Sequence, residues 1–172
     1  MAQLTTKRLR MESWTIELAD AAMNDQSKLS RSLGVTVPDD FPNKPVRHVV
    51  LPSKLMELRE DPSRGVWSGI IIHVGDNIII GSMGFKAPPD REGIVEIGYD
   101  IIPAYQSQGY ATEMAKALIA WAFEQPSVRV ITAECLPDNW ASARVLQKVG
   151  MRQVNSSADM VRWELPRIIG QL

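Results

Sequence analysis

The chain has 172 residues, of which 45% are hydrophobic and 23% are charged, and its formal net charge is −1. That length allows one domain with a sizeable core, and the near-zero charge excludes the broad basic field typical of proteins that bind nucleic acid. A single cysteine, Cys135, excludes an internal disulfide and a cysteine-rich metal site. No apolar run reaches the roughly 20 residues of a membrane span, and no signal-peptide core is present. We therefore expect a cytoplasmic protein without a metal, in which residues 1–172 form a single domain.

The N-terminal part predicts short elements and one long loop. Residues 9–11 are typical of a strand, and residues 15–33 predict a helix that Gly34 ends. Residues 35–49 carry three prolines and no clear period, so they predict a loop. Irregular stretches of that length are often functional or mobile. A second helix is expected over residues 52–61.

The middle of the chain changes to a strand pattern. Residues 65–74 and 77–85 are rich in β-branched residues and are joined by a tight turn. A polar turn leads to a third strand over residues 93–102. Three consecutive strands with short turns predict an antiparallel meander.

The C-terminal part alternates helix and strand. Residues 110–125 have apolar side chains at helical spacing. A strand follows over residues 128–136, then a helix over residues 139–150 with Asn139 as its N-cap, and two closing strands. A meander followed by this alternation predicts one α/β domain with a mixed sheet.

The turn "QSQGYA", residues 106–111, joins a predicted strand to a predicted helix. A helix N-terminus leaves backbone N–H groups without partners, and its dipole favours anions. Small residues such as Gly109 and Ala111 allow a phosphate to approach that backbone. The turn has neither the Lys-Ser/Thr pair of a P-loop nor the three glycines of the dinucleotide fingerprint. By itself it is better explained as an ordinary strand-to-helix turn with nothing bound.

Two motifs in order resemble the GNAT superfamily of acyl-CoA-dependent N-acyltransferases. "QSQGYA" is similar to the family's Gln/Arg-x-x-Gly-x-Gly/Ala segment, and "NWASARVLQKVGM", which starts at residue 139, is similar to its second signature. "TTKRLRM" and "EIGYDI" look like the ribosomal-protein N-terminal acetyltransferase branch. The resemblance is strong over residues 96–151 and weak over residues 34–61. It implies a GNAT-like mixed sheet, with an antiparallel meander, a parallel strand pair that splays at the cofactor site, and about four helices.

The resemblance also implies acetyl-CoA as co-substrate. The turn would hold its pyrophosphate, and the end of the preceding strand would bind the pantetheine arm like an added strand. Asn139 would bind the pantetheine amides and Ser142 would lie near the thioester, although both are also explained as ordinary first-turn residues of a helix. The predicted cofactor-binding residues are Ile101, Ile102, Gln106, Gln108, Gly109, Tyr110, Ala111, Thr112, Asn139 and Ser142.

The family's chemistry implies a general base. An amine attacks only when neutral, and the pKa is about 7.7–8.0 for an α-amine and about 10.4 for lysine. Glu96 interrupts an apolar strand, so its pKa should be raised by desolvation, as suits a base. Glu134 in the next strand is the second predicted catalytic carboxylate. The competing interpretations are that Glu96 is exposed or forms a salt bridge, with Arg91 as the candidate partner, and that Glu134 is a solvated residue at the end of a strand. Gln147 stands where many relatives carry a proton-donating tyrosine, so either Tyr105, Tyr110 or solvent takes that task or no acid is needed.

These features predict an N-acetyltransferase whose acceptor is an amine-bearing small molecule or a protein N-terminus. An alternative is a non-catalytic module that binds acyl-CoA as a sensor or scaffold, and a third is a nucleotide-binding α/β protein. Neither nucleic acid nor a membrane is an expected partner. Homodimers are common in the family, and the sequence leaves the oligomeric state and the identity of the amine open.

Overall fold

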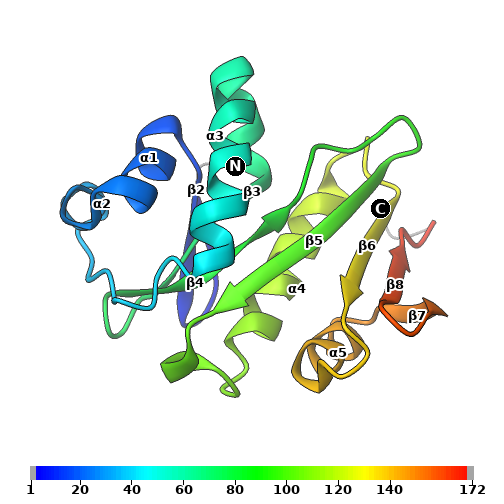
Figure 1. Ribbon diagram of the computed structural model, residues 1–172. Helices are drawn as coiled ribbons and strands as arrows, with labels where there is room; N and C mark the ends of the chain where they lie inside the picture. The colour runs from blue at the N-terminus through cyan, green and yellow to red at the C-terminus, as the bar shows by residue number, and fades with distance from the viewer. Residues whose placement is uncertain (1–2, 170–172) are drawn as a thin grey trace.

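A mixed sheet of eight strands runs through the molecule, and the computed structural model describes residues 3–169. In spatial order the strands are β1-β2-β3-β4-β5-β6-β8-β7 (Figure 1). Only β5 and β6 pair in parallel; the other neighbours are antiparallel within the described residues. The predicted meander and mixed sheet are confirmed. The strands are β1 (Gln3–Thr5), β2 (Leu9–Ser13), β3 (Ser68–His73), β4 (Ile78–Phe85), β5 (Ile94–Ile101), β6 (Val130–Cys135), β7 (Arg152–Ser156) and β8 (Val161–Pro166).

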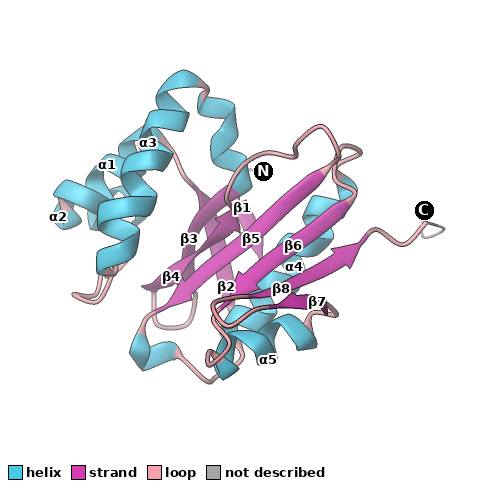
Figure 2. Ribbon diagram, turned by 45° about the vertical axis from the view of Figure 1, so that its right-hand side comes forward, coloured by secondary structure: helices cyan, strands magenta, loops and turns pink. Residues whose placement is uncertain are grey.

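Helices cover both faces of the sheet. Figure 2 shows α1, α2 and α3 together on one side of the sheet and α4 on the other. The α-helices are α1 (Ile16–Asn24), α2 (Gln26–Leu33), α3 (Leu51–Glu60), α4 (Tyr110–Glu124) and α5 (Trp140–Lys148). A π-helical segment η1 (Val46–Val50) and two 3-10 segments, η2 (Pro62–Trp67) and η3 (Pro103–Tyr105), complete the helical elements of residues 3–169. The expected number of about four helices was therefore too low.

The predicted single helix over residues 15–33 is wrong, because the chain breaks at Asp25. The backbone there is extended, with φ −152° and ψ 85°. Its side chain accepts a hydrogen bond from the Lys28 amide at 3.0 Å and caps α2. A short carboxylate that competes for backbone N–H groups favours the start of a new helix over the continuation of the old one.

The predicted loop over residues 35–49 is also partly wrong. Residues 44 and 45 are already helical and lead into η1, which runs directly into α3, so only residues 34–43 are irregular. Pro45 has φ −59° and ψ −42° at the start of η1. Proline is pre-organised for a first helical turn. The third proline therefore begins a helix, although in the sequence it is typical of a loop.

The turn that precedes α4 is tied to the N-terminal hairpin through Glu113. Its carboxylate accepts hydrogen bonds from the Thr6 hydroxyl at 2.7 Å, the Arg8 amide at 2.9 Å and the Arg8 Nε at 2.6 Å. Arg8 also donates to the Gln108 carbonyl at 3.2 Å, and its guanidinium lies 4.2 Å from the centroid of the Tyr110 ring. Partial burial raises the pKa of Glu113, but the bonds from Thr6 and Arg8 outweigh it, so that pKa is lowered.

Glu113→Gln should lower the free energy of unfolding at pH 7 by about 1–2 kcal/mol, because charge-assisted hydrogen bonds are lost. Folding lowers the pKa of Glu113, so its ionised carboxylate stabilises the folded protein at pH values above the pKa of the unfolded state. This contribution disappears as the pH falls through the pKa of the folded state. Urea unfolding at pH 7 and at pH 3 should therefore show a smaller difference between variant and wild type in acid. Glu124→Gln, at the exposed end of the same helix, is the control. An equal loss of stability at both pH values would contradict the prediction.

Candidate active site

The parallel pair β5 and β6 separates along its length. Their pairing runs from Ile94 and Val130 to Glu96 and Thr132 and then stops. The other edge of β5 continues to pair with β4 as far as Ile101. Figure 1 shows the ends of the two strands far apart. Beyond Glu96, the β6-facing edge of β5 is therefore free of a parallel partner within the described residues, and an extended ligand can take the place of a strand there.

The turn before α4 presents the geometry of an anion site. Gly109 is the N-cap with φ 83° and ψ 6°, and no side chain caps the helix. The first amides of this 15-residue helix, at Tyr110, Ala111 and Thr112, therefore have no intrahelical partner. A side chain at Gly109 would be strained by its positive φ, and its Cβ would lie 3.5 Å from Arg8 Nη2. Uncapped amides at a helix N-terminus are suited to an anion, and the predicted phosphate site at this turn stays a prediction.

The two glutamines of the turn bind main-chain carbonyls of the same segment. The side-chain amide of Gln106 donates to the Ile101 carbonyl at 2.8 Å, and that of Gln108 donates to the Ala104 carbonyl at 3.0 Å. The Ile102 amide donates to the Ile80 carbonyl at 2.8 Å. The glutamines brace the turn, and the Ile102 amide is already engaged within the protein.

Helix α5 closes the splayed side. Asn139 caps it by accepting a hydrogen bond from the Ser142 amide at 3.1 Å, so the predicted capping role is confirmed. The Ser142 hydroxyl lies 3.0 Å from the Tyr99 hydroxyl of β5. These contacts bridge the gap between β5 and α5 where β6 no longer pairs with β5.

A cavity of about 280 Å³ occupies the gap between β5, β6 and α5. It brings together four predicted residues, Glu96, Glu134, Asn139 and Ser142, and we call it the splay cavity. Glu96 is part-exposed and forms an ion pair with Lys86, not with Arg91, and Glu134 is exposed on β6. The predicted turn residues, 106–112, do not line this cavity.

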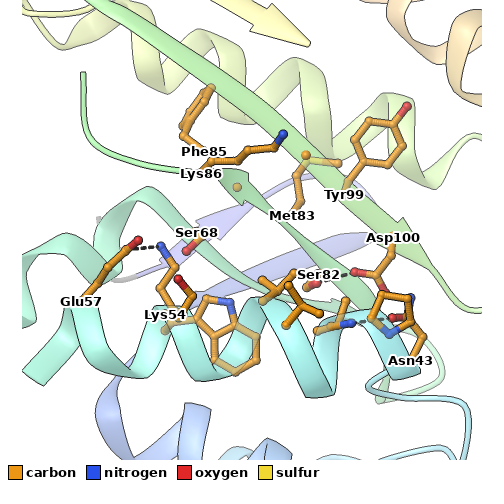
Figure 3. A pocket seen from close by; sticks show the side chains of 18 residues that line it. Asn43, Lys54, Glu57, Ser68, Ser82, Met83, Phe85, Lys86, Tyr99 and Asp100 are labelled. Carbon is orange, nitrogen blue, oxygen red and sulfur yellow. Dashed lines mark hydrogen bonds and ion pairs between the residues drawn. The ribbon is translucent and has the colours of Figure 1, made fainter. Parts of the chain in front are cut away.

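A second, larger cavity of about 470 Å³ lies between β3–β5 and the helical segment formed by η1 and α3 (Figure 3). We call it the acceptor cavity. Asn43, Pro45 and Val46 line it, so part of the segment predicted as a loop forms its wall. Most other wall residues are apolar. Its polar groups include Asp100 with Ser82 at one end and Lys54 with Glu57 and Ser68 at the other, and Lys86 and Tyr99 also line it (Figure 3).

The two cavities share Lys86, Gly98 and Tyr99. A Cβ added at Gly98 would have only Lys86 Cε within 4 Å, at 3.9 Å. Neither packing nor a positive φ requires glycine there, and its missing side chain keeps the passage open. Because β-strand residues alternate, Glu96, Gly98 and Asp100 lie on one face of β5. The passage is therefore flanked by a carboxylate on each side.

Burial acts on two titratable groups beside this passage. It raises the pKa of Asp100, and a hydrogen bond from the Ser82 hydroxyl opposes that shift only in part. Burial also raises the pKa of the Tyr99 hydroxyl, although its contact with Ser142 acts in the opposite direction. Tyr99 therefore keeps its proton at neutral pH. Sequence analysis gave no role to Tyr99, and it expected Asp100 only as part of the strand end that binds the pantetheine arm, because the burial of its side chain depends on η1 and α3.

Tyr105 and Tyr110 lie elsewhere. The Tyr105 hydroxyl donates to Asp76 at 2.7 Å, and the Tyr110 hydroxyl lies 3.1 Å from His73 Nε2. Neither tyrosine lines the splay or the acceptor cavity. Across residues 3–169, no group of three or more His, Cys, Asp or Glu side chains could hold a metal ion. In the same range, no helix has the length and apolarity that crossing a membrane requires.

Comparison with known proteins agrees with this geometry. The model of the acetyltransferase (GNAT) domain matches residues 8–152. The uncharacterized N-acetyltransferase YjdG of Bacillus subtilis is 31% identical over 163 residues, which cover 95% of this chain and 97% of YjdG. The fold resembles that of RimL, a ribosomal L7/L12 α-N-protein acetyltransferase solved in complex with coenzyme A. The TM-score is 0.66 at 14% sequence identity, and the match covers 95% of this chain and 97% of RimL.

It also resembles the microcin self-immunity acetyltransferase MccE, solved with acetyl-CoA and AMP, with a TM-score of 0.65 at 13% identity and 94% of each chain covered. The family predicted from the two motifs is thus confirmed, and so is the predicted GNAT-like fold. On these matches, the chain belongs to the GNAT family of acetyltransferases and is an acyltransferase.

Proposed function

We propose that this protein transfers the acetyl group of acetyl-CoA to a primary amine. The observation that carries the proposal is the meeting of two cavities at Gly98, one opening from the splayed strands and one from the face covered by α3. Such an arrangement suits two substrates that approach from opposite sides. A module that only binds acyl-CoA has no use for the second cavity, so the enzyme is favoured over the binding module.

The donor would occupy the turn and the splay cavity. The free amides at Tyr110, Ala111 and Thr112 would hold the pyrophosphate, and the free edge of β5 would bind the pantetheine arm. Acetyl-CoA as donor is supported by the presence of CoA in the RimL complex and of acetyl-CoA in the MccE complex. The thioester would then lie near Ser142, at the passage between the cavities.

In the proposed reaction, the acceptor's ammonium first loses a proton to solvent. The neutral amine then attacks the thioester carbonyl, a C–N bond forms, the C–S bond breaks, and the CoA thiolate leaves. One proton passes from the amine to a base, and the thiolate takes up another. Glu96 is the proposed base, because its part-exposed carboxylate lines the splay cavity beside the passage and can exchange its proton with solvent. Glu134 on the facing strand is a second carboxylate for attracting the amine.

Asp100 is proposed to bind the incoming ammonium. It lines the acceptor cavity and accepts a hydrogen bond from Ser82, and it lies two residues from Gly98, about 7 Å along the strand. Tyr99 is the proposed proton donor to the thiolate. It keeps its proton at neutral pH, and its hydroxyl contacts Ser142 at 3.0 Å.

The test of the function is release of free CoA thiol from acetyl-CoA over a panel of primary amines and N-terminal peptides. Gly98→Leu should lower kcat/KM for the best amine by about 10² or more, because misplacing the reactants by about 1 Å can have that effect. It should retain CoA binding in calorimetry, because the turn at Gly109 is unchanged. Gly98→Ala should keep most activity, since its methyl group fits the open space. CoA binding without turnover of any amine would refute the enzyme and leave the binding module.

The roles of the two carboxylates can be separated kinetically. With Glu96 as the base, Glu96→Gln should lower kcat by about 10²–10⁴ with little change in KM. Asp100→Asn should mainly raise KM for the amine. In the wild type that KM should rise as the pH falls through the raised pKa of Asp100, because the carboxyl group loses its charge. Steady-state kinetics between pH 5 and 9 measure all three effects. If Asp100→Asn instead lowered kcat and Glu96→Gln raised KM for the amine, the two roles would be exchanged.

Tyr99→Phe should lower kcat by about 10²-fold if the hydroxyl protonates the leaving thiolate. Tyr105→Phe is the matched control, because that hydroxyl is bound to Asp76 outside both cavities. Both variants are compared with the same amine and by CoA calorimetry, which separates weakened binding from slowed chemistry. Equal kcat values for the Tyr99 variant and the wild type would assign protonation to solvent.

A further inference from the structure

The end of the acceptor cavity near α3 contains two buried hydrogen-bond donors. Lys54 is only 6% exposed, and its ammonium donates to Glu57 at 2.9 Å. Ser68 is 7% exposed, and its hydroxyl is buried without any hydrogen-bond partner. Both residues line the cavity, and Figure 3 shows them next to each other at the same end. Buried polar groups are nearly always paired, so an unpaired hydroxyl in the wall of a cavity is a position where a bound molecule can supply the missing partner.

The donors available define the chemistry of that ligand. An ammonium group has three N–H donors and no acceptor, so Lys54 keeps donor capacity after its bond to Glu57. The Ser68 hydroxyl can donate as well. Two adjacent donors suit an oxygen with free lone pairs, such as that of a carboxylate or an amide. Glu57 offsets much of the Lys54 charge, so the preference for an oxygen over a second ammonium rests on the N–H and O–H donors that Lys54 and Ser68 still have available.

An open path joins this end of the cavity to the proposed reaction point. Ser68 pairs with Gly84 across β3 and β4, and Gly84 pairs with Gly98 across β4 and β5. Directly paired residues share a face of the sheet, so these three positions form one row. A Cβ at Gly84 would lie 2.1 Å from that of Ser68, which excludes a side chain there. Gly84, which lies between Gly98 and Ser68 in this row, therefore places no side chain on this part of the cavity wall.

We infer that Lys54 and Ser68 bind a carboxylate or amide oxygen of the acceptor, while the acceptor's amine lies at Gly98. This inference rests on the proposed acetyl transfer and adds a substrate class to it. Gly98 and Ser68 are separated by two strand spacings, which is about 10 Å. Because a hydrogen bond to Ser68 takes up about 3 Å, about 7 Å remains between the amine nitrogen at Gly98 and the acceptor's oxygen.

An extended chain covers that distance in roughly six bonds. The distance between the amine nitrogen and the oxygen fits 5-aminopentanoate and its amide. It fits equally the distance from the N-terminal amine of a dipeptide to the oxygen of its second carbonyl. An α-amino acid places its carboxylate too close to the amine. The acceptor class is therefore an amine with a carbonyl oxygen roughly six bonds away, whether it belongs to an ω-amino acid or to a short peptide.

The experiment compares kcat/KM for five acceptors. We expect 5-aminopentanoate, 5-aminopentanamide or glycylglycine to exceed pentylamine by at least 10-fold, and 1,5-diaminopentane to be no better than pentylamine. Preference for the acid over the amide identifies the oxygen as a carboxylate, and preference for glycylglycine identifies a peptide source. A kcat/KM at least 10-fold above that of pentylamine for any of these three oxygen-bearing acceptors supports the inference. A preference for pentylamine or for the diamine overturns it.

Two variants test the donors separately. Lys54→Met keeps the length of the side chain and removes its charge, and Ser68→Ala removes only the unpaired hydroxyl. Both should reduce the preference for the oxygen-bearing acceptor over pentylamine by about 10-fold, whereas Lys28→Met, an exposed lysine on α2, should keep it. An unchanged preference in both cavity variants overturns the inference.

Calorimetry with the CoA-bound protein separates the two proposals. Binding of 5-aminopentanoate that Lys54→Met weakens, without turnover of any amine, supports the oxygen site and refutes acetyl transfer. Turnover of amines without any preference for an oxygen-bearing acceptor refutes the oxygen site and leaves acetyl transfer intact.

Discussion

The parallel pairing of β5 with β6 ends after Glu96 and Thr132, and the rest of the site depends on that interruption. Beyond it, β5 remains bonded to β4 on one edge while its other edge is open. Main-chain N–H and C=O groups in the middle of a sheet need partners, so the open edge is a place for an extended ligand. α5 reaches across the gap through the contact between Ser142 and Tyr99, so the opening is held without being filled.

The remaining parts of the site are arranged around this opening. Gly109 leaves the first amides of α4 uncapped near one end of it, and Arg8 with Glu113 anchors that turn to the N-terminal hairpin. On the other face of the sheet, η1 and α3 cover a cavity that shares Gly98 as a lining residue with the splay cavity. The anion-binding turn and the acceptor cavity are thus built by distant segments of the chain, and β5 is the element that connects them.

The site could be predicted in part, because some of its signals are local in sequence. The glycine of "QSQGYA", the cap at Asn139 and the carboxylate of Glu96 within an apolar strand each depend on neighbouring residues. The strand pattern and the change to helical spacing predicted the mixed sheet for the same reason. The predictions that failed were those where a local signal has two meanings. Asp25 lies inside a helical pattern but caps a new helix, and Pro45 is typical of a loop but begins η1.

The sequence by itself determined the family, the order of most strands and helices, and the turn at the start of α4, because periodicity, caps and glycine positions act over a few residues. Only the tertiary structure decided which side chains meet at the passage. The Asp100 carboxylate becomes half-buried because η1 and α3 cover the cavity that it lines, and Tyr99 meets Ser142 because α5 packs across the gap. Ser68 lies in one row with Gly98 because of strand register. Burial and register depend on contacts between segments far apart in the chain, and no local pattern encodes them.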